Sequence, residues 1–207
     1  MRLLIVRHGE TEANLGLVIQ GHSPNSLSAR GKQQAIKLGE RLQGELIDAA
    51  YSSDLVRARE TAEIISSVSG ISIKYRSELR ERCYGIFQSR PVAEYELALS
   101  TSGLARQSFA PDQGESLRDL EARVLSFLET ILSMHANETV LVVAHAGPNR
   151  TLLKLLLNKS YDEWLTIEQD NACFNAIEIS SGHIDPLVLN CTAHLVAVGV
   201  SPLGVHE

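Results

Sequence analysis

The sequence predicts an α/β fold: a three-layer α/β/α sandwich with a mostly parallel central sheet. Two observations carry this expectation. Short apolar runs alternate with segments of helical spacing along most of the chain, and residues 3–6 and 140–144 are continuously apolar, as in strands buried on both faces. The 207 residues suffice for a substantial core, and no repeat or linker interrupts them, so we expect a single domain over residues 1–207.

The first elements follow from apolar spacing and from residues that start or stop helices. A strand is expected at residues 3–6. The helix after it begins at Ser28, a good N-cap residue, and carries an apolar stripe from Ala35 to Leu46. Residues 48–52 form a second short apolar run, which predicts the second strand.

The next helix is expected to be capped by Ser53 or Asp54 and closed by Gly70. Residues 71–75 alternate apolar and polar side chains, so they predict a strand. The stretch of about 82–115 has the least regular pattern. It predicts a short helix after Pro91 and a loop around residues 111–114.

The last third of the chain predicts two helices and a strand pair. Residues 115–135 form a long amphipathic helix, and the apolar run that follows it ends in a tight turn at residues 147–148 before another helix. Residues 174–195 read as a terminal hairpin with turns at residues 181–182 and 185–186.

Composition limits the classes of function. The net charge is −6 and the sequence pI is about 5.7, so the basic excess of a nucleic-acid-binding protein is missing. No apolar run approaches the roughly 20 residues that span a membrane, and the first residues lack the pattern of a signal peptide. Cys83, Cys173 and Cys191 are scattered, as expected for buried reduced thiols in a cytoplasmic protein.

Cationic and titratable side chains follow three of the predicted strands. Arg7 and His8 end the first strand, Arg57 lies in the first turn of the helix after the second, and His145 follows the run 140–144. Ligands of parallel sheets bind beyond the carboxyl ends of the strands. If these strands are neighbours, the arginines and histidines converge on one small volume.

Such a cluster predicts a site for a phosphoryl group. Two guanidinium groups repel each other unless an anion lies between them, and arginine binds phosphate as a fork. A histidine beside these cations stays neutral, and a neutral imidazole can attack phosphorus. Gly9 would leave room for phosphate close to the chain. Each residue alone would fit a structural histidine or a surface arginine, but their recurrence at separate strand ends favours a site.

The motifs then indicate a family. The segments "RHGETEAN" and "VAHAG" resemble the motifs of the histidine phosphatase superfamily, also called the phosphoglycerate mutase-like family. The similarity covers nearly the whole chain and implies the phosphoglycerate mutase-like fold. Further segments that resemble family motifs in order are "QG", "SLSARGKQQA", "SSDLVRARETA", "LRERCYG", "GES" and "LNCTAHL".

The resemblance implies a role for each matching residue. His8 would be the nucleophile, and Glu81 the acid that protonates the leaving oxygen and then the base that activates water. His145, Arg7 and Arg57 would hold the phosphoryl oxygens. The pocket would be completed by Asn14, Gln20 and Gly21. Fixed cations would replace a metal ion, so the resemblance implies no metal and no organic cofactor.

Several neighbouring residues each have two possible roles. Glu78 is a rival acid, although it is more typical of a surface carboxylate. Arg80 and Arg82 flank Glu81 and are expected to be solvated or salt-bridged, the alternative being contact with an acidic substrate; Arg150 is equally open. The histidines expected at the surface are His135, His183 and His206.

Two reactions fit the same pocket. The short distance from Glu81 to "GES" leaves no room for the extra segment of the cofactor-dependent mutases, which favours a phosphatase with residues 82–115 capping the substrate. A phosphoglycerate mutase and a catalytically idle phospho-ligand or partner-binding scaffold are the alternatives. The expected partner is a small phosphomonoester: phosphoserine, phosphoglycerate, a sugar phosphate or another metabolite. A homodimer is possible.

Overall fold

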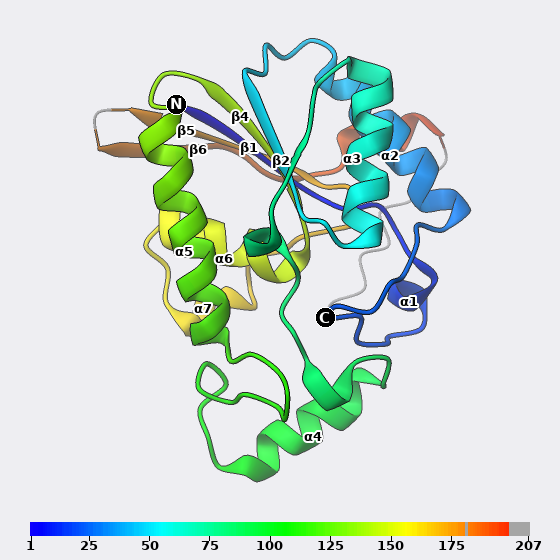
Figure 1. The fold of residues 1–207 in the computed structure, drawn as a ribbon, viewed down its shortest axis with the longest axis vertical. Helices are drawn as coiled ribbons and strands as arrows, with labels where there is room; N and C mark the ends of the chain where they lie inside the picture. The colour runs from blue at the N-terminus through cyan, green and yellow to red at the C-terminus, as the bar shows by residue number, and fades with distance from the viewer. Residues whose placement is uncertain (181, 199–207) are drawn as a thin grey trace.

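A computed structural model describes residues 1–180 and 182–198 of the chain. Its centre is a six-stranded sheet in the order β3-β2-β4-β1-β5-β6 (Figure 1). The first four strands in this order run parallel, whereas β5 and β6 are antiparallel. The strands are β1 (Arg2–Arg7), β2 (Ala49–Ser52), β3 (Lys74–Tyr75), β4 (Thr139–Ala144), β5 (Phe174–Ser180) and β6 (His183–Cys191).

Helices cover both faces of this sheet (Figure 1). On one face, α5 (Leu117–Met134) and α6 (Ala146–Leu156) bury their apolar sides in one core cluster. On the other face, α2 (Ala29–Leu42) and α3 (Val56–Ser69) pack in a second cluster. Strands β1, β2 and β4 are therefore buried on both faces, and the predicted three-layer α/β/α sandwich is confirmed. The short helices are α1 (Glu12–Leu15), α4 (Val92–Ser102), α7 (Tyr161–Trp164), and the 3-10 turns Ser77–Leu79, Gly85–Phe87 and Ala193–Val198.

Strand β1 fixes the position of the site. Leu3 and Ile5 enter one core cluster and Leu4 and Val6 the other, because successive side chains of a strand point to opposite faces. The parallel register pairs the last residue of β1 with the last residue of β4. The residues that follow the two strands therefore emerge at the same edge of the sheet.

Several predicted helix ends are confirmed, and one is shifted. The Ser28 hydroxyl accepts a hydrogen bond from the Gly31 N–H at the start of α2, and Gly70 closes α3 in the left-handed conformation, with φ of 76°. The N-cap of α3 is Leu55, not Ser53 or Asp54. The Ser53 hydroxyl instead accepts from the Leu55 N–H, one turn before the helix.

Four local expectations were wrong. Helix α2 ends at Leu42, and Leu46 is 90% exposed, because the apolar stripe does not continue past the helix. The expected strand 71–75 is reduced to β3. Residues 147–148 form no turn but lie in the first turn of α6, where proline costs no hydrogen bond. Residues 185–186 lie inside β6, since an irregular edge strand tolerates proline.

The cysteines and outlying histidines also differ in part from expectation. Cys173 is buried, whereas Cys83 and Cys191 are half-buried, and all three are free thiols. His135 is not at the surface: its Nε2 lies 2.8 Å from the Tyr51 hydroxyl inside the core. His183 is exposed, as expected. Position 181 of the expected turn and His206 lie outside the described residues.

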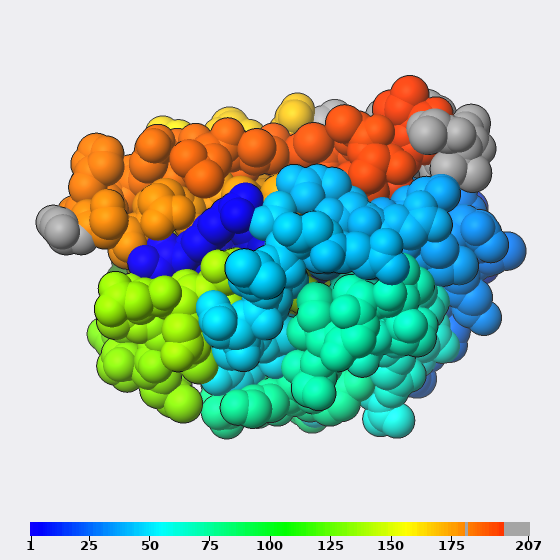
Figure 2. Space-filling view, turned by 90° about the horizontal axis from the view of Figure 1, so that it is seen from above, coloured from blue at the N-terminus to red at the C-terminus, as the bar shows by residue number. Residues whose placement is uncertain are grey.

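The part of the chain from Gly85 to α5 lies beyond the carboxyl edge of the sheet, where α4 is set apart from the main layers (Figure 1). A small apolar cluster of its own, built on Ile19, Phe87, Tyr95 and Leu99, holds it together. Figure 2 shows the opposite end of the molecule, where the start of the chain (dark blue) lies beside the β5–β6 hairpin (orange). Among the helices of the described residues, none combines the length and the apolar character that crossing a membrane requires.

Candidate active site

His8 follows β1 directly and is almost completely buried, with 2% of its surface exposed. Its Nδ1 lies 2.7 Å from the Gly9 carbonyl oxygen. A carbonyl oxygen only accepts hydrogen bonds, so Nδ1 must carry the proton. In the neutral ring, Nε2 therefore keeps its lone pair, and it accepts a hydrogen bond from Arg57 Nε at 3.2 Å.

Two arginines from different elements surround this imidazole. Arg57, in the first turn of α3, also donates from Nη2 to the Gly21 carbonyl at 2.9 Å. Arg7, the last residue of β1, donates from Nη1 to the Gln169 carbonyl at 2.6 Å. The Arg7 Nε is buried and has no hydrogen-bond partner within the described part of the chain. The site thus holds buried positive charge that the described residues leave partly unsatisfied.

His145 is the N-cap residue of α6 and is fully buried. Its ring centre lies 5.1 Å from that of His8, and its Nε2 is 2.9 Å from the Ser53 hydroxyl. The other ring nitrogen, Nδ1, is buried and finds no partner in residues 1–180 or 182–198. The two predicted histidines are therefore neighbours, as the paired ends of β1 and β4 require.

Both histidines are held neutral. Burial lowers the pKa of His8 well below its usual value, and the charges of Arg57 and Arg7 lower it further, against the raising effect of the Gly9 carbonyl. Burial is also the main cause that lowers the pKa of His145, followed by the charge of Arg57. At neutral pH the positive field of the site therefore comes from the arginines.

Glu81 is buried and its carboxylate is held at the N-terminus of α6. Its Oε2 accepts a hydrogen bond from the Gly147 N–H at 3.2 Å, and its Oε1 accepts from the Arg82 N–H at 2.8 Å. Oriented N–H groups at a helix start stabilise a carboxylate. A Cβ at position 147 would collide with Glu81 Oε1, so this approach depends on glycine.

The remaining predicted residues divide into two groups. Gln20 and Gly21 line the pocket, and Gly21 has a φ of 48°, which favours glycine. Asn14 does not line the pocket: its side-chain oxygen accepts from the Thr11 N–H and closes the capping box of α1. The Thr11 hydroxyl lies 3.0 Å from Gln20 Oε1, so Asn14 reaches the pocket only through its neighbours.

Gly9 lies where two segments of backbone pack closely against each other. Its missing Cβ would meet the Gly31 carbonyl in the first turn of α2, and a Cβ on Gly31 would in turn meet the Glu10 backbone. The close packing of two backbones therefore requires both glycines.

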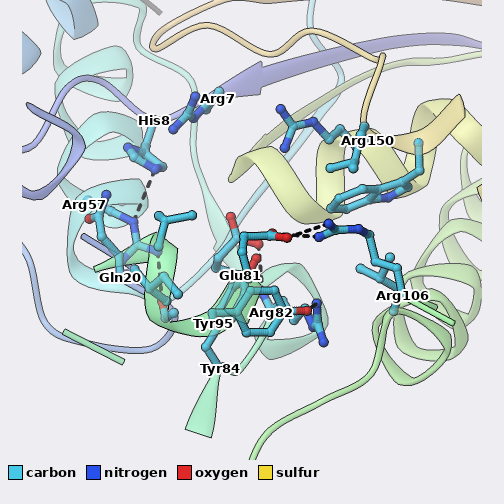
Figure 3. A pocket seen from close by; sticks show the side chains of 17 residues that line it. Arg7, His8, Gln20, Arg57, Glu81, Arg82, Tyr84, Tyr95, Arg106 and Arg150 are labelled. Carbon is cyan, nitrogen blue, oxygen red and sulfur yellow. Dashed lines mark hydrogen bonds and ion pairs between the residues drawn. The ribbon is translucent and has the colours of Figure 1, made fainter. Parts of the chain in front are cut away.

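One pocket collects most of these residues (Figure 3). Figure 3 shows His8, Arg57 and Gln20 on one side of it and Arg106 and Arg150 on the other, with Glu81 between them. The space between its walls is about 670 Å³, a figure that includes open solvent at its mouth. The other lining residues are Arg7, Ile19, Gly21, Arg82, Tyr84, Val92, Tyr95, Glu96, Leu117, Trp164 and Leu165.

Arg82 contradicts the expectation of a solvated or salt-bridged side chain. It is 2% exposed, and its three nitrogens donate to the Glu115 carbonyl, the Tyr95 hydroxyl and the Phe109 carbonyl at 2.7 to 2.8 Å. It therefore ties the segment before α5 to α4. Arg80 forms the expected salt bridge, a bidentate pair with Asp54.

The residues that hold the backbone around Glu81 in place could not be identified from the sequence. Arg123, on α5, donates to the carbonyl oxygens of Glu78, Arg80 and Glu81 at 2.8 to 2.9 Å and forms a two-bond ion pair with Glu115. The His22 Nε2 lies 2.8 Å from the Glu81 carbonyl oxygen. The signal that could have found Arg123 is a long basic side chain amid the apolar spacing of α5.

The structure also decides between the alternatives for Glu78 and Arg150. The side chain of Glu78 is half-buried and does not line the pocket, so it does not compete with Glu81 for that position. Arg150 is buried, donates from Nε to the Ile167 carbonyl and lies over the Trp164 ring. Within the described residues there is no group of three or more His, Cys, Asp and Glu side chains that could hold a metal ion.

Comparison with known proteins agrees with this geometry. Residues 3–192 match the model of the histidine phosphatase superfamily, branch 1. The adenosylcobalamin/alpha-ribazole phosphatase of Escherichia coli is 31% identical over 197 residues, which are 93% of this chain and 97% of that protein. A Salmonella choleraesuis protein named as a probable phosphoglycerate mutase is 36% identical over 151 residues, 70% of this chain and 69% of its own.

The fold has solved counterparts as well. The crystal structure of the alpha-ribazole phosphatase from Shigella flexneri superimposes with a TM-score of 0.84 at 30% identity and covers 92% of this chain and 96% of that one. The architecture and the order of the motifs thus point to the same group of proteins.

Proposed function

Since the chain belongs to the histidine phosphatase superfamily, we propose that it hydrolyses a small phosphomonoester through a phosphohistidine on His8. One observation carries this proposal. The Gly9 carbonyl holds the proton on Nδ1, so the Nε2 lone pair of a buried, neutral His8 faces the guanidinium of Arg57. A nucleophile and a binding group for the phosphoryl oxygens are thereby placed within one hydrogen bond of each other.

The first step transfers the phosphoryl group to the protein. Arg57 exchanges its hydrogen bond to His8 for one to a phosphoryl oxygen, which exposes the Nε2 lone pair. The lone pair forms the N–P bond while the ester P–O bond breaks. Glu81, carrying a proton, delivers it to the departing oxygen, a contribution of roughly a hundredfold to ten-thousandfold.

The second step returns the protein to its starting state. Glu81, now a carboxylate, takes a proton from a water molecule as that water attacks phosphorus. The N–P bond breaks, its electron pair returns to His8 Nε2, and inorganic phosphate leaves. The hydrogen bonds from Gly147 and Arg82 support this exchange because they keep the carboxylate in one place through both steps.

Charge stabilisation falls to the protein itself. Phosphoryl transfer depends mainly on positioning and on opposing the charge of the equatorial oxygens. Arg7 and Arg57 supply that charge, with the buried Nε of Arg7 and Nδ1 of His145 as polar groups that a phosphoryl oxygen would satisfy. Asn14 would not touch the phosphoryl group but would position Gln20 through Thr11. Activity in the presence of a chelator is therefore expected.

Hydrolysis is the preferred reaction of this site. Two relatives are named as alpha-ribazole phosphatases, and the segment of about 82–115 that we propose as the cap holds only α4 and short turns. A mutase must keep water from its phosphohistidine, and this cap is small. The relative named as a probable phosphoglycerate mutase keeps isomerisation as the second candidate. A single domain, a cytoplasmic location and a possible homodimer remain predictions.

A panel of phosphomonoesters incubated with the protein in chelator tests the proposal. Release of phosphate from at least one ester supports a phosphatase. Isomerisation of phosphoglycerate that requires priming by bisphosphoglycerate would instead identify a mutase. No turnover of any ester together with no acid-labile phosphoprotein would identify an idle scaffold.

A further inference from the structure

The half of the pocket that lies beyond Glu81 differs in character from the half around His8. We propose that it binds an uncharged, ring-bearing alcohol group, so that the substrate is the phosphomonoester of an apolar cyclic alcohol and not a small hydroxy acid phosphate. This inference rests on the proposed function, because it assigns the part of the substrate that leaves.

Apolar side chains from distant parts of the chain line the same pocket as Arg82, Glu96, Arg106 and Arg150. Ile19 follows α1, Val92 begins α4, and Leu117 begins α5. The wall is completed by Trp164 and Leu165 at the end of α7. These apolar side chains favour an apolar group on the substrate, since contact removes both surfaces from water.

Aromatic rings form the base of the same region. Tyr84 and Tyr95, which both line the pocket, meet edge to face with ring centres 5.2 Å apart. The guanidinium of Arg82 lies over both rings, at 5.0 and 5.3 Å, and its nitrogens are committed to three oxygen acceptors. Such rigid rings favour stacking or edge contact with a planar partner.

One ion pair at the far side, beside the cationic Arg150, works against a second anionic group. Arg106 is paired through both terminal nitrogens with both oxygens of Glu96, at 2.8 and 2.6 Å. Both residues line the pocket, so a substrate carboxylate would have to displace Glu96 from its partner. Phosphoglycerate and phosphoserine each carry that carboxylate, and the ion pair therefore selects against them.

Phosphate esters of unactivated alcohols test this proposal, because their leaving groups are similar in reactivity and differ mainly in the group that the pocket would bind. The probes are benzyl phosphate and 2-naphthylmethyl phosphate against glycerol 1-phosphate and 3-phosphoglycerate. We expect kcat/KM for the ring-bearing esters to exceed that for the other two by about tenfold or more, since a few apolar carbons suffice for such a ratio.

Two substitutions locate the preference in the distal half. Leu165→Asp should lower the ratio of ring-bearing to glycerol ester activity by about threefold to tenfold. Leu97→Asp is the matched control, because Leu97 is also an exposed leucine but does not line the pocket. Glu96→Gln releases Arg106 and should raise kcat/KM for 3-phosphoglycerate about threefold, whereas Glu94→Gln, on the same helix but outside the pocket, should not.

The outcomes distinguish a failure of the substrate assignment from a failure of the proposed phosphatase function. Turnover with no preference for the rings, or with 3-phosphoglycerate as the best substrate, overturns the assignment of the distal half and leaves the phosphatase intact. An equal loss of the preference in Leu97→Asp and Leu165→Asp also overturns it. Failure to hydrolyse any of the four esters, with no phosphoprotein formed, rejects the proposed function itself.

Discussion

The N–H of Gly147 donates to the carboxylate of Glu81, and a side chain at position 147 would occupy the space of that same carboxylate. The carboxylate of Glu81 therefore packs directly against the start of α6, and glycine at position 147 makes this contact possible. Gly147 lies in the first turn of α6, two residues after the buried His145, so the same helix start positions both groups.

Gly147→Ala tests whether this fit matters to the reaction. The added methyl group would displace the carboxylate, while the helix itself gains a better helix former. We expect kcat for benzyl phosphate to fall about tenfold to hundredfold. The loss for 4-nitrophenyl phosphate should be much smaller, since its leaving group needs no proton. Gly44→Ala, with open space around its Cβ, is the control and should leave both rates unchanged.

Arg123 is expected to position Glu81 without touching the substrate. Arg123→Lys keeps the charge but loses the fork that holds the three carbonyl oxygens before and at Glu81. The rate for benzyl phosphate should fall about tenfold, with KM nearly constant and the 4-nitrophenyl ester less affected. Arg118→Lys, an exposed arginine of the same helix, is the matched variant. Equal losses on both esters would mean that Arg123 only stabilises the fold.

The free energy of unfolding should decrease as the pH is lowered, because His8 and His145 are buried as neutral rings. Their pKa values are lowered in the folded state by burial and by the nearby arginines, whereas an unfolded histidine takes up a proton near pH 6.5. Between that pH and the lower folded pKa the unfolded state binds more protons. Each histidine then costs up to about 1.4 kcal/mol per pH unit as the pH falls.

Urea unfolding at pH 7.5 and pH 5.5 measures this dependence. His8→Gln should reduce the loss of unfolding free energy between the two pH values, because the substituted group does not titrate. His183→Gln serves as the reference, since His183 is exposed. An unchanged loss in His8→Gln would show that His8 takes up its proton equally in the folded and unfolded protein.

The sequence allowed the general plan of the sheet and of the cluster around His8 to be predicted. Residues 3–6 and 140–144 are short, apolar and bounded by charge, and parallel strands place their carboxyl ends at one edge. That local information is sufficient to bring His8 and His145 together, and the structure finds their ring centres 5.1 Å apart.

The errors arise where a residue's environment is set by distant segments. Arg82 looked like a surface cation, yet its acceptors come from Tyr95, Phe109 and Glu115, between 13 and 33 residues away. Gly9 packs against Gly31, a contact between backbones that no local pattern encodes. Glu81 depends on Arg123 in the same way. Such contacts follow from how the layers pack and not from the period of the sequence.

The most direct test of the account is to mix the protein with 4-nitrophenyl phosphate in chelator, quench it with base within the first turnover, and map the phosphate by mass spectrometry and by its 31P chemical shift. The account predicts an acid-labile phosphate on Nε2 of His8, absent in His8→Ala. Sustained hydrolysis by His8→Ala, or a phosphate found on another residue, would contradict it.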